Sequence, residues 1–347
     1  MKHVCLFFIG LFLFSCKSKI NSTQSPTRVR IDTLLQDKIS IRAIVLDNNK
    51  VWYAADQSRF GCINLDTNKK NEMQIQSEKN TEYRNIAQTN QYVFILSVAN
   101  PALLYRISKE DWRYELVYQE IHEKVFYDSM QFWNDLEGMA VGDPIEGCFS
   151  IITTRDGGNS WQKIPVNQLP QLVDGEAAFA ASNSNIVMKG NDVWVVSGGK
   201  KSRVFFSKDK GKSWVVNDSP IVQGKPMTGI FTADFYNSKT GFISGGNYEV
   251  LNQNFDNKAI TQDGGKTWKL VAQNQGFGYA SCVQYVPNSN AKKIVSVGSS
   301  GIFYSKDGGI HWEQWSTDTS LFTIRWLNET TAIAAGKNKV IRIRFQK

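Results

Sequence analysis

Cysteine, histidine and proline are all scarce in this chain of 347 residues, which contains 5 Cys, 3 His and 8 Pro. So few cysteines exclude a disulfide-rich scaffold, and no closely spaced pair suggests a metal site. Only His122 and His311 lie beyond the first few residues, and they are far apart, which argues against a histidine-based zinc site. The low proline content argues against long disordered stretches. We therefore expect a folded chain that needs no metal and no other cofactor.

Long apolar runs are also missing. The segment from Val4 to Phe14 is apolar apart from Cys5 and Gly10. It is much shorter than the roughly 20 residues that a membrane-spanning helix needs. It follows a short positively charged start, and this combination is typical of a secretory signal. We therefore expect residues 1–15 to be a signal peptide that directs export.

The end of this segment, Leu13-Phe14-Ser15-Cys16, resembles the lipobox of bacterial lipoproteins, although Phe14 is bulkier than the residue usual before the small one. The resemblance implies that Cys16 is acylated, which would hold the protein at a bacterial membrane, facing the periplasm or the cell surface. Two or three acyl chains suffice for stable anchoring. Residues 16–27 would then be the lipidated cysteine and a polar tether, and residues 28–347 a single folded domain.

Three cysteines remain after such processing, and the net charge stays positive. We interpret Cys62, Cys148 and Cys282 as small buried residues on strands, and whether two of them form a disulfide stays open. The formal net charge is +8, but Lys and Arg are dispersed along the chain. This pattern indicates a solvated basic surface and no nucleic-acid partner, with a phospholipid surface or an acidic glycan as the alternative.

A repeated turn sequence is the strongest signal in the chain. It reads hydroxyl-x-Asp-x-Gly-x-x-Trp, and its Trp-to-Trp steps are 53, 54 and 44 residues. Each copy lies between two apolar strand-like segments, so it predicts a hairpin turn in which Asp accepts hydrogen bonds and Gly supplies positive φ. The hydroxyl group can close the same network, and Trp can anchor the turn between sheets. The conserved positions within the chain are Asp156 and Trp161, Asp209 and Trp214, Asp263 and Trp268, and Asp307 and Trp312.

This turn resembles the Asp-box, or bacterial neuraminidase repeat, of sialidases, sortilin-type receptors and photosystem II assembly factors. The resemblance implies a β-propeller in which the boxes are structural and lie away from the active face. Units traced from the boxes fall near residues 39–76, 82–120, 125–166, 175–220, 227–272 and 278–316. Three further strands follow after Leu321. We expect the strand Arg28–Leu35 to pair as the outer strand of this last group and close the ring. The sequence thus predicts seven four-stranded blades, with six blades as the alternative.

Functional residues of propellers gather at the mouth of the central channel. Arg42, Arg84 and Asp128 each lie six residues before an Asn in the first turn of their units, which predicts equal height around the channel. Glu176 lies seven residues before Asn183, and a one-residue bulge would reconcile the difference. Such a polarised mouth suits a carboxylate or a sugar, and ordinary channel-lining polar residues are the alternative. The predicted mouth residues are Arg42, Arg84, Asp128, Asp143, Glu176, Arg203 and Arg325.

The repeats look most like the non-enzymatic assembly-factor branch of the superfamily and its bacterial lipoprotein relatives. This implies an envelope scaffold that binds another protein of a complex, or an anionic ligand such as a glycan. Sialidases carry an Arg-Ile-Pro motif, and here Arg106-Ile107-Ser108 lacks the Pro. No catalytic residue can be named, so the sequence favours a scaffold over an enzyme. A carbohydrate-active hydrolase or lyase of sialidase-like fold is the alternative.

The lipoprotein prediction can be tested at Cys16. Replacement by Ser should leave the chain unacylated, because the acceptor thiol is lost, and should move it from the detergent fraction to the soluble fraction or leave it unprocessed. Fractionation and gel mobility identical to the parent protein would contradict the prediction.

Overall fold

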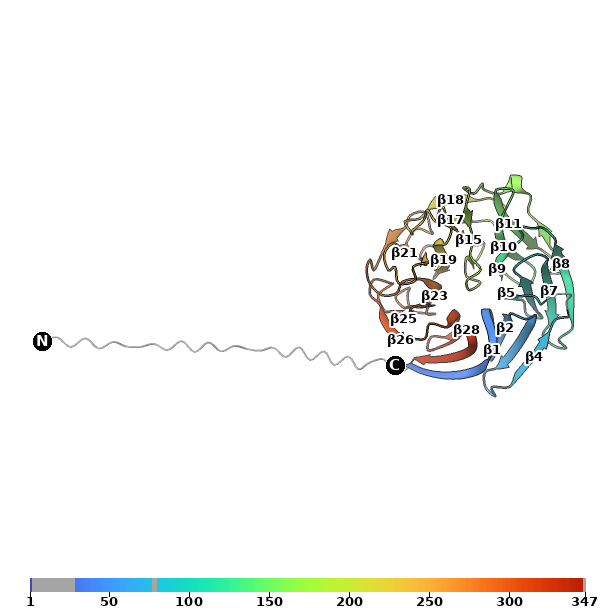
Figure 1. Ribbon diagram of the computed structural model, residues 1–347, viewed down its shortest axis with the longest axis horizontal. Coiled ribbons are helices and arrows are strands. Elements are labelled where there is room, and N and C mark those ends of the chain that lie inside the picture. The colour runs from blue at the N-terminus through green and yellow to red at the C-terminus, as the bar shows by residue number, and fades with distance from the viewer. Residues whose placement is uncertain (2–28, 77–79, 346–347) are drawn as a thin grey trace.

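The computed structural model describes Met1 and residues 29–76 and 80–345. These residues form 28 β-strands and one short 3-10 helix, η1 (Val166–Gln168), and the sheets stand radially around a central opening (Figure 1). The fold is therefore an all-β propeller, as the sequence predicts. No helix in the described part is long and apolar enough to cross a membrane. Cys16 and the predicted tether lie outside the described residues.

Burial within each unit falls from the centre of the ring outward. β6 (Tyr92–Ser97) is buried over almost its whole length, because neighbouring sheets cover both of its faces. The outermost strand β4 (Lys70–Gln74) is polar and has no buried residue. Large aromatic side chains fill the spaces between sheets, as where Trp194 stacks on Phe235 with ring centroids 3.9 Å apart. Cys62, Cys148 and Cys282 are all buried, as expected, and the structure shows that all three are free.

The described strands form six hydrogen-bonded sheets, two with six strands and four with four. The first contains, in order, β27 (Leu321–Asn328), β28 (Thr331–Phe345), β1 (Val29–Asp47), β2 (Lys50–Ala55), β3 (Arg59–Asn64) and β4. The next two are β5 (Tyr83–Gln88), β6, β7 (Ala102–Ser108) and β8 (Tyr114–Glu120), and β9 (Tyr127–Phe132), β10 (Gly138–Ile145), β11 (Cys148–Thr154) and β12 (Gln162–Lys163). The fourth is β14 (Ile186–Lys189), β15 (Asp192–Val196), β17 (Arg203–Ser207) and β18 (Val215–Asp218). The fifth is β13 (Glu176–Ala177), β16 (Gly198–Gly199), β19 (Thr228–Phe235), β20 (Gly241–Asn247), β21 (Lys258–Thr261) and β22 (Lys269–Leu270). The last is β23 (Ala280–Tyr285), β24 (Ile294–Gly298), β25 (Gly301–Ser305) and β26 (Glu313–Ser316).

Six sheets match the six-blade alternative, and the prediction of seven separate blades is not confirmed. The reason lies in the first sheet. The three C-terminal strands predicted as part of a seventh blade are hydrogen-bonded, through β1, to β2, β3 and β4. One long strand therefore serves two groups of strands, and the sheet is continuous across them.

The N-terminal strand closes the ring, as expected. The first part of β1 pairs antiparallel with β28, from Val29 opposite Phe345 to Leu35 opposite Val340. Its second part pairs with β2, from Ile41 opposite Ala55 onward. Figure 1 shows β1 in blue and β28 in red running side by side along the rim. Strands from the two ends of the described chain thus cover each other's open edges.

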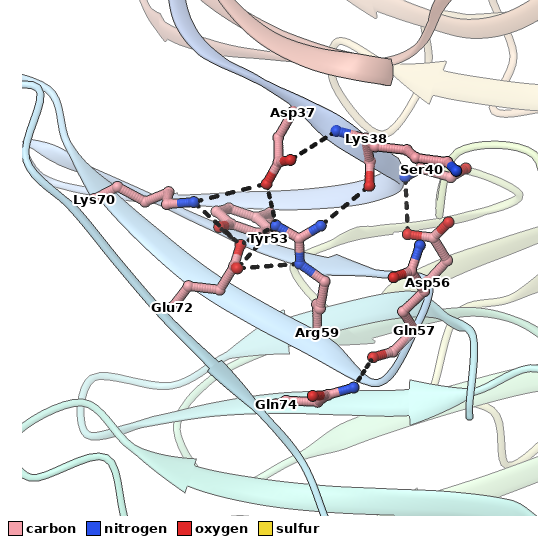
Figure 2. Close-up of polar contacts among 10 residues, drawn as sticks. All are labelled: Asp37, Lys38, Ser40, Tyr53, Asp56, Gln57, Arg59, Lys70, Glu72 and Gln74. Atoms are coloured by element: carbon pink, nitrogen blue, oxygen red, sulfur yellow. Dashed lines mark hydrogen bonds and ion pairs between the residues drawn. The ribbon is translucent and has the colours of Figure 1, made fainter. Parts of the chain in front are cut away.

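An ion-pair network fixes the part of β1 that passes from β28 to β2 (Figure 2). The Arg59 guanidinium donates Nε to Glu72 Oε1 at 3.0 Å and Nη1 to the Lys38 carbonyl at 3.2 Å, and it pairs with the Asp37 carboxylate. The Tyr53 hydroxyl donates to Glu72 from the other side. Burial and the hydrogen bond to Glu72 raise the pKa of Tyr53. The network therefore ties the crossing of β1 to β2, β3 and β4.

The turns between first and second strands and those between third and fourth strands share one face of the ring. In six units a backbone N–H of the later turn donates to a carbonyl of the earlier turn at 2.7–3.0 Å. Examples are Gly157 N to Leu136 O and Gly264 N to Lys239 O. We call this surface, which carries Thr154–Trp161, Ser207–Trp214, Thr261–Trp268 and Ser305–Trp312, the turn face. The opposite surface, where the innermost strands begin, is the mouth face.

The same pattern of hydrogen bonds recurs in each of the four repeat turns. In the third copy, Asp263 Oδ1 accepts from Thr261 Oγ1 at 2.8 Å and from Thr267 N at 3.0 Å, and Oδ2 accepts from Thr267 Oγ1 at 2.6 Å. These hydrogen bonds, above all those from Thr267, lower the pKa of Asp263 to about 2. Gly265 has a φ of 88°, which L side chains rarely adopt, so this position needs glycine. Each turn is thus held by its own side chains.

A segment of the fourth unit fills the centre of the channel. Residues 178–185 leave β13, cross the channel and enter β14, and we call them the plug. Asn183 receives a hydrogen bond from Met130 N at 2.8 Å and donates one to Ile86 O at 2.8 Å. Ser182 Oγ donates to Ser281 O at 2.6 Å. The expectation that Asn183 forms a first turn is therefore wrong, because this side chain satisfies backbone groups of two other units.

The Arg59 network generates a stability prediction. Arg59→Met should lower the free energy of unfolding by about 1 kcal/mol, since the partly buried Glu72 carboxylate loses the closer of its two cations and keeps only Lys70. The matched control is Arg113→Met, whose ion pair with Asp111 has the arginine side chain 88% exposed, and which should change stability by at most about 0.5 kcal/mol. Equal effects of the two substitutions in chemical denaturation would show that the crossing of β1 does not depend on Arg59.

Candidate binding site at the channel mouth

A regular β-bulge aims one side chain per innermost strand toward the channel. In six innermost strands the pairing register shifts near the start of the part that pairs with the second strand. A bulge leaves the extra residue unpaired and redirects its side chain. The bulged residues are Arg42 in β1, Arg84 in β5, Asp128 in β9, Phe231 in β19, Ser281 in β23 and Phe322 in β27.

Four of the predicted site residues line one cavity on the mouth face. The cavity has a volume of about 430 Å³ and contains Arg42, Arg84, Asp128 and, from β10, Asp143. The plug forms its floor, and residues 177–181 are part of the lining. The six-residue offset from the first-turn Asn thus places Arg42, Arg84 and Asp128 on the same cavity.

The same offset could have found two site residues that the sequence analysis missed. Phe231 lies six residues before Asn237, and Phe322 lies six residues before Asn328. Both are bulged residues. Phe231 lines the cavity, and Phe322 lies under the Arg42 guanidinium, 4.1 Å from its ring centroid to Cζ. A search for charged side chains alone passed over them.

Two carboxyl groups lie together on the third unit. Asp128 is fully buried, and neither of its carboxylate oxygens has a hydrogen-bond partner among the described residues. Burial and the neighbouring Asp143 raise the pKa of Asp128 well above its usual range, against the opposing effect of Arg84. Burial also raises the pKa of Asp143 to about 6, although its Oδ1 accepts a hydrogen bond from Ala178 N at 3.1 Å. Burial therefore favours the neutral form of Asp128, and Asp143 titrates near pH 6.

The two arginines differ in how they are satisfied. Arg84 makes a bidentate ion pair with Glu82, with Nε to Oε1 at 2.8 Å and Nη2 to Oε2 at 2.9 Å. Arg42 donates Nη1 to the Ala181 carbonyl at 3.3 Å, and its Nε has no partner among the described residues. Burial, followed by the charge of Arg84, lowers the pKa of Arg42. The mouth thus holds one guanidinium with a free donor and no carboxylate bonded to it in the described part of the chain.

Aromatic rings form the other wall of the cavity. Phe231 stacks on Phe179 of the plug, with ring centroids 3.9 Å apart. Tyr279 meets Phe231 edge-on at 4.8 Å, and Tyr248 meets Tyr279 at 5.1 Å. Tyr248 is 44% exposed and begins a loop that also exposes Val250, Leu251 and Phe255. The site therefore presents charge on one side and apolar surface on the other.

Glu176 and Arg203 do not line this cavity. They form a buried ion pair with each other, in which Arg203 Nε donates to Glu176 Oε1 at 3.0 Å and Oε2 at 3.1 Å. Ser197 Oγ and Val173 N also donate to the Glu176 carboxylate, at 2.5 and 3.0 Å. The offset argument placed Glu176 at the mouth because it took Asn183 for a first-turn residue. Since Asn183 belongs to the plug, Glu176 and Arg203 instead join β13 of the fifth sheet to β17 of the fourth sheet.

Arg325 lies on the far side of the plug. It donates Nη2 to the carbonyls of Ser182 and Asn183, both at 3.1 Å, so it holds the plug in place. It lines a second cavity of about 630 Å³ that opens on the turn face, together with Gln88, Gln131 and Asp234. The plug thus divides the channel into two separate cavities. The described residues contain no group of three or more His, Cys, Asp or Glu that could hold a metal ion.

The pKa of Asp143 predicts how stability depends on pH. Its carboxyl has a higher pKa in the folded chain than the ordinary value near 4, so the folded state binds more protons between about pH 4 and 6. Stability should therefore fall as pH rises through this window, by up to about 3 kcal/mol. Asp143→Asn keeps the acceptor for Ala178 N and should reduce this slope, while the raised pKa of Asp128 still contributes to it. A melting-temperature profile from pH 4 to 7 that is the same for both proteins would contradict the assignment.

Comparison with known proteins supports the fold. No family model and no curated protein sequence matches the chain. Among solved structures, YCF48 bound to D1 peptide aligns with a TM-score of 0.66 and 11% identity over 92% of this chain and 97% of that chain. YCF48 from Cyanidioschyzon merolae aligns with a TM-score of 0.65 and 11% identity over 91% and 98% of the two chains. The WD40 repeats of RRP9 give a TM-score of 0.65 and 11% identity over 91% and 97%. At this identity the likeness establishes only a β-propeller fold, shared with YCF48 and with the WD40 repeats of RRP9.

Proposed function

We propose that this protein is a binding scaffold that holds a segment of another protein at the mouth of its channel. The observation that carries the proposal is Arg42, a largely buried cation with a free donor beside an aromatic wall. A buried charge without a partner is costly, and a ligand carboxylate would satisfy it. One of the similar structures is titled as bound to a peptide, which supports a protein ligand.

The size and surroundings of the cavity favour a short segment. A volume of about 430 Å³ suits a few side chains and excludes a folded domain. An acidic side chain or chain terminus would lie against Arg42, and an apolar side chain against Phe231 and Tyr279. Flanking residues would cross the loop that exposes Val250, Leu251 and Phe255. Aromatic and arginine side chains in such a centre are typical of sites that carry most of a binding energy.

The cellular setting belongs to the same proposal. The signal peptide, an acylated Cys16 and a tether of residues 16–27 would place the scaffold in the bacterial envelope. The repeat turns would be Asp-boxes with a structural role, since their Asp side chains are engaged within the turns. We also propose that the continuous first sheet acts as two blades. The register of β1 against β28 shifts between Gln36 and Ser40, just before β1 begins to pair with β2 at Ile41, and a division there would give seven blades.

A carbohydrate-active hydrolase or lyase is the second candidate. Asp128 and Asp143 are adjacent carboxyl groups with raised pKa values in a cavity, which is the kind of pair that general acid and base catalysis uses. The aromatic wall could also hold a sugar ring. Hydrolysis of fluorogenic glycosides by the parent protein, lost in Asp143→Asn, would establish this function in place of the scaffold.

The scaffold proposal predicts the effect of Arg42→Met. Binding to immobilised peptides that combine acidic and aromatic residues should weaken about tenfold or more, because the carboxylate loses its partner. The melting temperature should stay the same or rise, since Met replaces an incompletely satisfied cation and can still cover Phe322.

Arg113→Met, on the turn face, is the control and should bind the peptides like the parent. Peptides in which Asn and Gln replace the acidic residues should bind all three proteins equally weakly. Full binding by a folded Arg42→Met protein would remove Arg42 from the site.

A further inference from the structure

A cluster of exposed lysines lies on the turn face over three neighbouring units. The repeat turns of the fourth, fifth and sixth units and the first turns bonded to them supply these residues. Trp194 Nε1 donates to Gly264 O at 2.8 Å, and Asn290 N donates to Tyr236 Oη at 3.0 Å, so the turns of adjacent units are held side by side. We call Lys208, Lys212, Lys239, Lys266, Lys292 and Lys293, all exposed, the lysine cluster.

Local acidic groups offset only part of the charge of this cluster. Asp209, Asp263 and Asp307 of the same turns accept hydrogen bonds from their own turns, which lowers their pKa values and keeps them ionised. Lys210 is different, because it pairs with Glu137 of the preceding unit. Within the described part of the chain, no ion pair joins a lysine of the cluster to a carboxylate. Six lysines against three aspartates therefore leave an excess of positive charge facing solvent.

The described chain also begins on this face. Val29 pairs with Phe345, whose N–H donates to the Thr330 carbonyl at 2.9 Å, just past the end of β27 at Asn328. An extended chain of the length between Cys16 and Val29 reaches at most about 40–45 Å. A membrane anchor at Cys16 would thus join the propeller at its turn face and keep that face within about 45 Å of the lipid.

We infer that the lysine cluster binds the anionic headgroups of a phospholipid bilayer and orients the propeller with its turn face on the membrane. Lysines near a negatively charged surface attract it over about one Debye length, and their contributions add. Each lysine is expected to raise the partition coefficient about fivefold. The mouth face then stays open to segments of other proteins. The inference is independent of Arg42, because the cluster lies on the opposite face.

Vesicle co-sedimentation of the full chain tests this inference. All proteins carry Cys16→Ser, so acylation cannot contribute, and the vesicles are phosphatidylcholine alone or phosphatidylcholine and phosphatidylglycerol in equal parts. The cluster variant combines Lys208→Gln, Lys212→Gln, Lys266→Gln and Lys292→Gln. The control variant makes the same change of charge at exposed lysines of the mouth face, with Lys38→Gln, Lys124→Gln, Lys200→Gln and Lys225→Gln.

Binding of the parent should be stronger to the anionic vesicles and should fall as salt increases. The cluster variant should lose at least tenfold of this excess binding, and the control variant should keep most of it. Equal losses in the two variants, or no preference of the parent for anionic vesicles, would overturn the inference. Binding to heparin without binding to vesicles would also overturn it. Peptide binding at the mouth, measured on the same proteins, should be unchanged in the cluster variant, so failure of one proposal leaves the other standing.

Discussion

Closure of the ring through β1 and β28 is the constraint on which the rest of the structure depends. The ring of a propeller must close, and here the closing pairing joins residues from opposite ends of the described range 29–345, Val29 and Phe345. The same strand β1 then supplies Arg42 to the mouth. A slip of β1 by one residue would turn its side chains to the other face and displace Arg42. The Arg59 network acts at the crossing between these two pairings, so it secures both the closure and the register of the site.

The site arises from departures from regular strand pairing. A bulge in each of six innermost strands turns side chains into the channel, and the plug replaces what would be a continuous innermost strand in the fourth unit. Short polar side chains suit the plug, because Ser182 and Asn183 must reach backbone groups of several units within a narrow channel. The plug in turn gives the mouth its floor and part of its aromatic wall through Phe179. Regular sheets supply the frame, and these irregular segments supply the cavity.

The sequence was informative where local chemistry repeats and misleading where a segment serves distant partners. Hydroxyl, Asp and Gly positions predicted the turns, and the six-residue offset brought Arg42, Arg84 and Asp128 to one cavity. That offset failed at Glu176, because Asn183 does not form a first turn. Its side chain bonds the backbone of Met130 and Ile86, which lie more than 50 residues away in the sequence. The number of sheets could not be predicted, since the sequence does not show that β1 is continuous between two groups of strands. The sequence likewise did not predict the lysine cluster, because its lysines are dispersed along the chain and lie near one another only in the folded ring.

The charge balance of the mouth follows from which groups can ionise there. Arg84 is neutralised by Glu82, and burial keeps Asp128 in its neutral form. The remaining charges are Arg42 and, above about pH 6, Asp143. Below that pH the cavity carries a net positive charge from Arg42, and above it the negative charge of Asp143 offsets the positive charge of Arg42. An anionic ligand in this cavity would be repelled by ionised Asp143, so it would bind best when Asp143 is protonated. Ligand binding and the protonation of Asp143 would therefore be linked, and each would favour the other.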